Sequence, residues 1–579
     1  MPASTKKSPA GYSTYIGRVG ALAIFLGVGT TLGMATASAD SDSAAPSRTP
    51  ASVSSSSSAH PASGPSARGS HVSARSAAAG TRPSSRPAQA TTNRAAAAYT
   101  RRQSVAASVA ASIQPSNQVS PLGTPAQISR ESIAMNTAAT LPVTLMKFVL
   151  RQGFLAAANQ QFALVGGPDA ANLQALDNAV DEYALASAFS EQILNPMDPA
   201  VVTQVAAPHS WYGLDVGGSR LLYDNPDTIY RFIPVNKTSE YVLTGRLYEG
   251  IPADTTFSVL EGTSGKTSSI LSLADLDVSP DGSFVITVSG EAAAPGQTNH
   301  LQLTSNSTLI AARNTLGDWV AEEPMGLEIH RVSGPPNSLF AQLGGFVLLG
   351  SLVNNNPLLA SLASIIPPLA IAEAPLVRGT LTALLMVVRG ANQEAKYMAL
   401  ATTDPTTGQL RQPNVMTQPA SNAEFLANQL QSNGYFQLAD DEALVLTIDP
   451  ASAGFFNTPV YNDWTITDDY WNQQTSLNND QAVANPDGTY TLVISPTDPG
   501  VANWVSTGGL NQGTISMRFQ NVAEPELDPP TVGSTVVSID QLATVLPGTT
   551  VYVTPDERAA QLAARLLGYN KRYAPYPQP

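Results

Sequence analysis

Hydrophobic positions along this chain follow two different periods in different regions. Between about 135 and 195 apolar residues recur every three or four positions, which predicts helices. Pro168-Asp169 is a typical helix start and Asn195-Pro196 a typical stop. The apolar positions that carry this pattern are Leu173, Leu176, Val180, Tyr183, Ala184 and Ile193.

Short alternating runs between turns replace this pattern from about 209 to 333, and again from about 442 to 553. Phe284–Val288 and Thr489–Ile494 are examples. Regular short strands with Gly/Pro turns are typical of a sandwich or jelly roll. The predicted fold class is therefore mainly β with added helices (α+β): two jelly-roll or β-sandwich-like units, with helical segments before, between and after them.

The two β regions share a local pattern that suggests duplication. Pro280–Ser289 and Pro486–Ser495 each consist of a Pro-Asp-Gly turn followed by an alternating strand, and Leu271 and Leu477 precede them in the same register. We therefore expect the second β unit to repeat the first.

Uncharged residues fill the connection between the two β regions from Leu339 to Ala372, with Asn and Pro interruptions. Two interpretations stay open: buried helices, or an apolar surface for lipid or a partner. Further on, Ser421 and Glu424 suit a helical capping box that Gly434 would end. Thr554, Pro555 and Glu557 form the same start signal for a last helix, which Gly568 would end.

The N-terminus has the layout of a secretory signal. Lys6, Lys7 and Arg18 precede the apolar run Val19–Val28, and Ala37-Ser38-Ala39 is a typical cleavage site. We expect an exported protein, secreted or associated with the cell envelope, with the signal either cleaved or retained as a membrane anchor.

Ser, Ala, Pro and Thr dominate residues 40–134, which predicts a disordered linker. Residues 1–134 carry a net charge of +9 and the remainder −23. The basic arm is either a soluble spacer or a segment that lies on anionic envelope polymer or lipid. Nucleic acid is not expected as a partner, because the body is acidic. The predicted segments are 1–39 signal, 40–134 linker, 135–208 helical, 209–335 first β unit, 336–439 helical connector, 440–554 second β unit and 555–579 C-terminal helix and tail.

Composition excludes several kinds of chemistry. The chain has no cysteine and five histidines, so disulfides, thiolate metal sites and cysteine nucleophiles are ruled out. Gly262–Thr267 lacks the first glycine of a phosphate-binding loop, and neither a Gly-x-Ser-x-Gly nor a His-Glu-x-x-His motif is present. We expect no metal site and no cofactor.

Two polar clusters are candidate sites. In the first, Asp224, Asp227 and Arg231 form either a turn that opens a strand or a pocket wall with acid/base groups. In the second, Trp464, Tyr470, Asn478 and Trp504 form either a buried core or an exposed platform for a sugar ligand.

These segments resemble a bacterial family, the domain of unknown function 1214. The residues that carry the resemblance are Asp224–Tyr230, Gln474–Asn478, Asn485–Gly488, Asp498–Trp504 and Gly513-Thr514. The resemblance is strongest over about 440–523 and weaker over about 209–333. Such proteins often carry the related domain of unknown function 1254, and the N-terminal arm resembles those of mycobacterial exported proteins. The resemblance implies β-sandwich units with helical additions and no known activity.

Three hypotheses for function follow. The first is a non-catalytic envelope protein that binds a glycan, lipid or protein partner. The second is an extracytoplasmic hydrolase in which Asp224 and Asp227 act as acid/base groups and Arg231 stabilises an anion. The third is a structural or assembly protein that packs through large β faces. The missing catalytic signatures favour the first.

Overall fold

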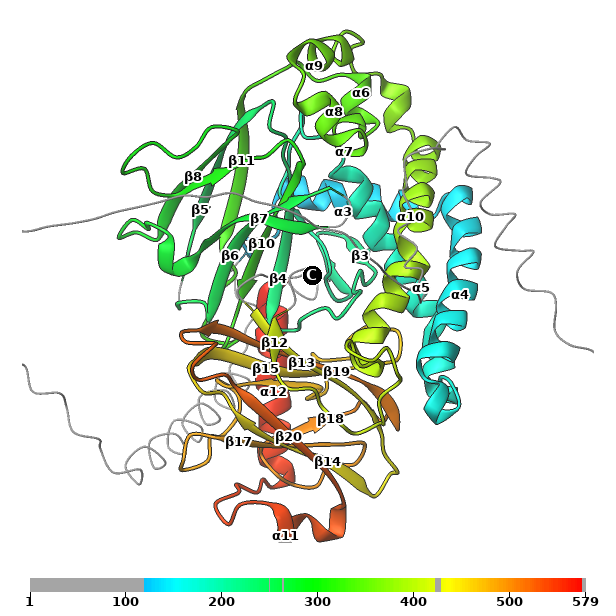
Figure 1. The fold of residues 1–579 in the computed structure, drawn as a ribbon, viewed down its shortest axis with the longest axis vertical. Helices are drawn as coiled ribbons and strands as arrows, with labels where there is room; N and C mark the ends of the chain where they lie inside the picture. Colours follow the sequence, from blue (N-terminus) through cyan, green and yellow to red (C-terminus); the bar gives the residue numbers. More distant parts are fainter. Residues whose placement is uncertain (1–118, 249, 263–264, 422–428, 575–579) are drawn as a thin grey trace, which may run out of the picture. The chain divides into compact units, whose positions relative to one another are not determined.

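Two β-sandwiches form the centre of the described fold (Figure 1). This computed structural model describes residues 119–248, 250–262, 265–421 and 429–574. The expected signal and the linker up to residue 118 lie outside this range. The mainly β, α+β fold class predicted from the sequence is confirmed.

The first sandwich pairs a five-stranded sheet with a four-stranded one. Phe284, Ile286 and Val288 alternate with smaller or polar residues on β8, so one face of the strand enters the core. The five-stranded order is β1 (Val202–Thr203), β4 (Thr228–Pro234), β10 (Ser307–Thr315), β6 (Asp254–Glu261) and β7 (Lys266–Ser272). The four-stranded order is β11 (Gly326–Ser333), β5 (Glu240–Arg246), β8 (Ser283–Ser289) and β9 (His300–Gln302). A small hairpin, β2 (His209–Trp211) with β3 (Leu214–Val216), stands apart from both sheets.

The second sandwich repeats this plan strand for strand. Its five-stranded order is β12 (Ala420–Ser421), β13 (Gln429–Gln437), β19 (Gln512–Val522), β15 (Ala453–Tyr461) and β16 (Ser476–Asn478). Its four-stranded order, taken from the opposite edge, is β20 (Thr531–Ser538), β14 (Glu442–Asp449), β17 (Tyr490–Ser495) and β18 (Trp504–Ser506). In both sandwiches the last two strands of the smaller sheet pair in parallel, while the other pairs are antiparallel.

The matching Pro-Asp-Gly turns occupy equivalent places before β8 and β17. Asp281 accepts from the backbone N–H and hydroxyl of Ser283, and Asp487 does the same with Thr489. Gly282 and Gly488 have φ of 83° and 92°, which a residue without Cβ adopts without strain. The two β units therefore share one architecture, as the repeated pattern suggested.

Helices before and between the sandwiches pack together. They include α3 (Pro125–Ala138), α4 (Leu141–Gln161), α5 (Ala170–Gln192) and α10 (Pro375–Thr402). Asp169 caps α5 by accepting from the Asn172 N–H at 2.8 Å, as its Pro168-Asp169 start signal predicted. Close approach of α4 and α10 depends on small residues, because a Cβ on Gly390 would lie 2.3 Å from Leu150 Cδ1.

Four short helices and one 3₁₀ turn connect the first sandwich to α10. They are α6 (Leu339–Gln342), α7 (Gly345–Leu348), α8 (Gly350–Asn354), α9 (Pro357–Ala363) and η3 (Ala370–Glu373). The remaining helices follow the second sandwich: α11 (Leu542–Val545) and α12 (Pro555–Arg572).

Two boundaries predicted for the first part of the fold are wrong. The linker does not extend to residue 134, because α3 begins at Pro125 and buries Ala134 and Ala138 against α5 and the first sandwich. The low apolar content of this segment resembled disorder, but two partly buried hydrogen bonds between Gln127 and Thr203 hold α3 in place. The first strand likewise begins at Val202, before the predicted start of the first β unit.

Helix signals were also misleading at two glycines. Ser421 ends strand β12, which pairs with β13, and Gly434 lies inside β13, where pairing with β19 outweighs the local helix signal. Glu424, the other residue of the predicted capping box, lies outside the described residues. The second β unit therefore begins at Ala420 rather than at residue 440. The capping box of Thr554 and Glu557 is confirmed, but α12 continues past Gly568 to Arg572. Gly568 is needed inside the helix because a Cβ there would lie 2.4 Å from Trp319 Cβ.

Candidate functional site

Asp224 and Asp227 are buried where the two β units meet. Asp224 accepts from the Thr467 N–H at 2.9 Å and from the Thr467 hydroxyl. Burial raises the pKa of Asp224 to about 6, against the opposing effect of Arg220. Asp227 accepts from three side chains: Trp319 Nε1 at 2.9 Å, Asn478 Nδ2 at 2.8 Å and Asn457 Nδ2 at 2.7 Å. Both carboxyl groups therefore tie the second unit to the first.

Arg231 points elsewhere, into the first sandwich. Its guanidinium donates to the Met325 carbonyl and lies 3.5 Å from Asn314 Oδ1. Burial lowers the pKa of Arg231 to about 9. The structure therefore does not bring Asp224, Asp227 and Arg231 to one open cleft, and the carboxylate-dependent hydrolase has no geometric support from these residues.

The predicted aromatic candidates are packing residues rather than an exposed platform. Trp464 is fully buried, stacks on Phe154 with a centroid distance of 6.5 Å, and donates to the Asn172 carbonyl. Tyr470 is buried in a separate cluster, edge-on to Trp319 at 5.8 Å. Of the two alternatives drawn from the sequence, the buried core describes these side chains.

Asn478 and Trp504 complete the set, and neither belongs to an exposed platform. Trp504 follows a turn at Asp498-Pro499-Gly500. Asn478 is buried, and its amide bonds Asp227 and the Gly317 carbonyl. The half-buried ring of Trp504 lies 4.9 Å from the guanidinium carbon of Arg558 on α12. Arg558 in turn pairs with Asp498 at 2.9 Å, so the turn residue anchors the helix.

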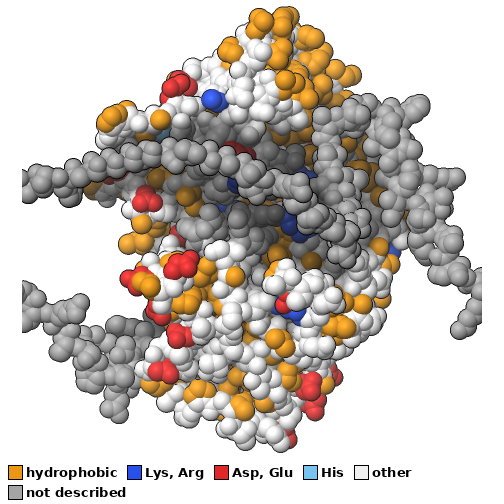
Figure 2. Space-filling view, in the orientation of Figure 1, with side chains coloured by type: hydrophobic (Ala, Val, Ile, Leu, Met, Phe, Trp, Pro, Cys, Tyr) orange, Lys and Arg blue, Asp and Glu red, His pale blue; other side chains and the backbone are white. Residues whose placement is uncertain are grey.

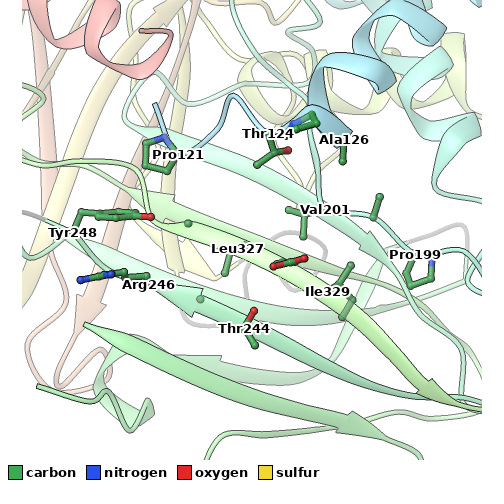
Figure 3. A pocket seen from close by; sticks show the side chains of 15 residues that line it. Pro121, Thr124, Ala126, Pro199, Val201, Thr244, Arg246, Tyr248, Leu327 and Ile329 are labelled. Carbon is green, nitrogen blue, oxygen red and sulfur yellow. The ribbon is translucent and has the colours of Figure 1, made fainter. Parts of the chain in front are cut away.

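An open groove lies at the β11 edge of the first sandwich (Figure 3). It has a volume of about 590 Å³ and lies between β5, β11 and the segments around Thr124 and Val201. The Arg246 guanidinium carbon lies 5.7 Å from the Tyr248 ring at one end. None of the site residues predicted from the sequence lines this groove. Among the described residues, no group of three or more His, Asp or Glu side chains could hold a metal ion.

Exposed apolar side chains are concentrated on the short helices. We call them the apolar tip: the ten exposed aliphatic residues between Leu348 and Leu376. Figure 2 shows hydrophobic side chains gathered over the region that Figure 1 labels α8 and α9. The members are Leu348, Leu349, Leu352, Leu358, Leu362, Ile365, Ile366, Leu369, Ile371 and Leu376. Of the two interpretations of this segment, buried helices or an apolar surface, both apply in part: its inner side chains, such as Phe346 and Val347, are buried, and the ten members of the tip are exposed.

Helix α4 adds a second exposed apolar face beside the tip. Leu141, Leu145 and Phe148 are each more than 60% exposed, while Val143, Leu150 and Phe154 are buried. Thr140, just before α4, packs against Gly379 near the start of α10. By length and composition α4 could cross a membrane, and 22% of its apolar window is buried.

Polar groups around the tip are satisfied internally. Asn356 accepts from the N–H groups of Leu358 and Leu359, and Gln342 Oε1 accepts from the Leu369 N–H. The nearby cation Arg378 pairs with the buried Glu191 at 3.1 Å. Nine members of the tip lie on the stretch from Leu339 to Ala372, which has no charged side chain, and the exposed Glu373 separates them from Leu376. Larger apolar patches of this kind mark interaction surfaces in soluble proteins.

One segment of the chain matches a family model. Residues 432–524 match the family described as Protein of unknown function (DUF1214), and these residues form the centre of the second β unit. The strongest part of the resemblance drawn from the sequence is thereby confirmed. The weaker similarity over 209–333 and the pairing with domain 1254 stay predictions. A search of curated proteins finds no match.

One solved structure has a similar fold. A crystal structure of an uncharacterised protein from Burkholderia cenocepacia matches with a TM-score of 0.50 and 22% identity, covering 71% of this chain and 100% of that chain. A protein from Vibrio parahaemolyticus matches at 12% identity with a TM-score of 0.31, covering 54% of this chain and 89% of that chain. The first likeness supports the fold alone.

Proposed function

We propose that this protein is an exported, non-catalytic binding protein of the cell envelope that attaches to lipid through the apolar tip. The carrying observation is the set of ten exposed aliphatic side chains, nine of which lie on a stretch without a charged residue. An interfacial segment buries such side chains at the boundary between headgroups and acyl chains.

The composition of the tip favours lipid over a protein partner. Protein interfaces are enriched in Tyr, Trp and Arg and have a polar rim, whereas the tip consists of Leu and Ile. Its backbone caps are satisfied by Asn356, Ser338 and Gln342, which entry into an apolar medium requires. Helix α4 lies on the bilayer in this proposal rather than across it, because its other face packs on α10 through Leu150 and Gly390.

Co-flotation of the full chain with phosphatidylcholine vesicles tests the proposal. Replacing Leu358, Ile365 and Ile371 by Ser should lower the partition coefficient at least about tenfold, since each fully buried aliphatic side chain contributes about 1.5–3 kcal/mol. All three are more than 65% exposed, so folding should tolerate the change.

A matched control comes from exposed aliphatic residues outside the tip. Ile251, Val332 and Leu527 are 81%, 63% and 82% exposed, and their replacement by Ser should leave flotation unchanged. An equal loss of flotation in both triple variants would contradict specific lipid binding by the apolar tip. Self-association of the full chain through the tip, without vesicle binding, would instead support the assembly hypothesis.

A further inference from the structure

Two arginines occupy matching positions on the two β units. Arg313 lies on β10 and Arg518 on β19, the central strands of the two five-stranded sheets. Residues that stand directly opposite on antiparallel strands share a face of the sheet. Arg313 stands opposite Tyr230 and Thr256, and Arg518 stands opposite Gln431 and Asn457.

Each arginine and the residues opposite it form a row of side chains on one face of their sheet. Both rows face away from the core of their own sandwich and toward the junction between the two β units. Ala312 and Met517, the chain neighbours of the two arginines, are core residues, so the arginines point outward. Arg518 donates to Tyr461 Oη at 2.8 Å and to the backbone carbonyl of Tyr223, in the segment that leads into β4. The row on β19 therefore reaches the end of the first sheet.

Arg313 stands directly opposite Tyr230, and the charge of Arg518 also acts on this phenol. Burial raises the pKa of Tyr230, while the charges of Arg518 and Arg313 both lower it. Tyr230 and Arg313 are half-buried and Arg518 is buried, so solvent reaches the Arg313 side of this junction. Tyr397 on α10 lies close enough to act on Arg313 as well.

Neither guanidinium has a carboxylate partner among the described residues. The buried Arg220, in contrast, makes a bidentate pair with Glu182 at 2.5 and 2.9 Å. The described residues give Arg313 a single hydrogen bond, from Nη1 to Ser258 Oγ at 3.3 Å. Asp254 acts on Arg313, and Asp224 on Arg518, from beyond ion-pair distance. Arg313 therefore keeps most of its donor capacity for an outside anion. Arg518 donates from Nη1 to Tyr461 Oη and the Ser516 carbonyl and from Nη2 to the Tyr223 carbonyl, which leaves two of its five N–H donors.

Buried acceptors without partners stand beside Arg518. Ser516 and Gln520 lie two residues before and after it, and therefore on the same face of β19, while Gln431 stands opposite. Ser516 Oγ, Gln520 Oε1 and Gln431 Oε1 are buried and have no hydrogen-bond partner in the described part of the chain. A buried polar atom left unpaired costs free energy, so a group that supplies hydrogen bonds here would be bound favourably.

We propose that Arg313, Arg518 and Tyr230 form a binding site for a small hydroxylated anion, such as a sugar acid or a sugar phosphate. The guanidinium groups bind its carboxylate or phosphate, which is their usual partner. The amide oxygens of Gln431 and Gln520 accept from its hydroxyl groups. The Tyr230 ring supplies a flat apolar surface for the ring carbons.

Isothermal titration calorimetry of the full chain tests the site with three probes at millimolar concentration: glucuronate, glucose 6-phosphate and glucose. The two anions distinguish a carboxylate from a phosphate ligand, and at least one should bind while glucose does not. Arg313→Gln should lower the affinity for the anion about tenfold, since it removes a charge-assisted hydrogen bond. Arg313→Lys should weaken it less, because the charge stays.

Arg331 is the matched control, because it is also half-buried and donates to Ser239 at 2.9 Å on the first unit. Arg331→Gln should leave binding unchanged, and thermal unfolding of each variant should show that it is folded. Equal binding of glucose, absence of binding by all three probes, or an equal loss in Arg331→Gln would overturn the proposal. Equally tight binding of acetate or inorganic phosphate would also overturn it, because the hydroxyl contacts would then contribute nothing.

Discussion

Glu394 on α10 should make the folded state less stable as the pH rises. Its carboxyl group is buried, with 1% of the residue exposed, and its described hydrogen bond comes from Thr465 Oγ1 at 3.0 Å. Burial raises the pKa of Glu394 from 4.5 to about 8. Glu394→Gln keeps the shape and an acceptor for Thr465 but cannot ionise.

The direction of this stability change with pH follows from proton linkage. Between pH 4.5 and 8 the folded chain holds a proton on Glu394 that the unfolded chain has lost, so stability falls as the pH rises through this window. At pH 7 the pH is 2.5 units above the unfolded value, and at 1.36 kcal/mol per unit the loss is about 3 kcal/mol. Full burial means that solvent screening does not reduce this figure.

Urea unfolding of the wild type and of Glu394→Gln, at pH 4.5 and pH 7, measures the effect. The free energy of unfolding of the variant minus that of the wild type should rise by about 3 kcal/mol from pH 4.5 to pH 7. Glu291→Gln at an exposed position controls for mutation alone and should change little at either pH. A variant that gains nothing over wild type between pH 4.5 and 7 would refute the reasoning.

Other predictions concern stability and export. Asp227→Ala leaves three buried side-chain donors without their acceptor and should lower the free energy of unfolding by at least about 3 kcal/mol. Unchanged stability would favour the acid/base role of Asp227 over a structural one. Trp504→Ala should cost about 2–3 kcal/mol in thermal unfolding, because the ring packs under Arg558, and an unchanged melting temperature would favour an exposed role. Thr554→Ala removes the capping box of α12 and should cost about 1 kcal/mol; a neutral result would mean that α12 is held by packing alone. N-terminal sequencing of the exported form should begin near Asp40, and recovery of only the intact Met1 form from the cytosol would contradict export.

Local patterns in the sequence determined much of the fold. Alternation predicted β8 and β17, the Pro-Asp-Gly turns revealed the duplication, and Asp169 and Thr554 marked true helix starts. These features depend on residues close to one another in the chain, so their physical causes are visible in the sequence. The same signals failed at Gly434, where pairing with β19, about eighty residues away, decides the structure.

Only the tertiary structure decided which side chains are exposed and which are paired. Asp227 and Trp464 have the composition of a site, but partners contributed by distant segments turn them into packing and anchoring residues. Conversely, Leu358 looks in sequence like any core leucine and is exposed. Arg313 and Arg518 are 205 positions apart, and no local pattern connects them. Burial and pairing are properties of the assembled chain, because they depend on which surfaces meet after the strands and helices have formed.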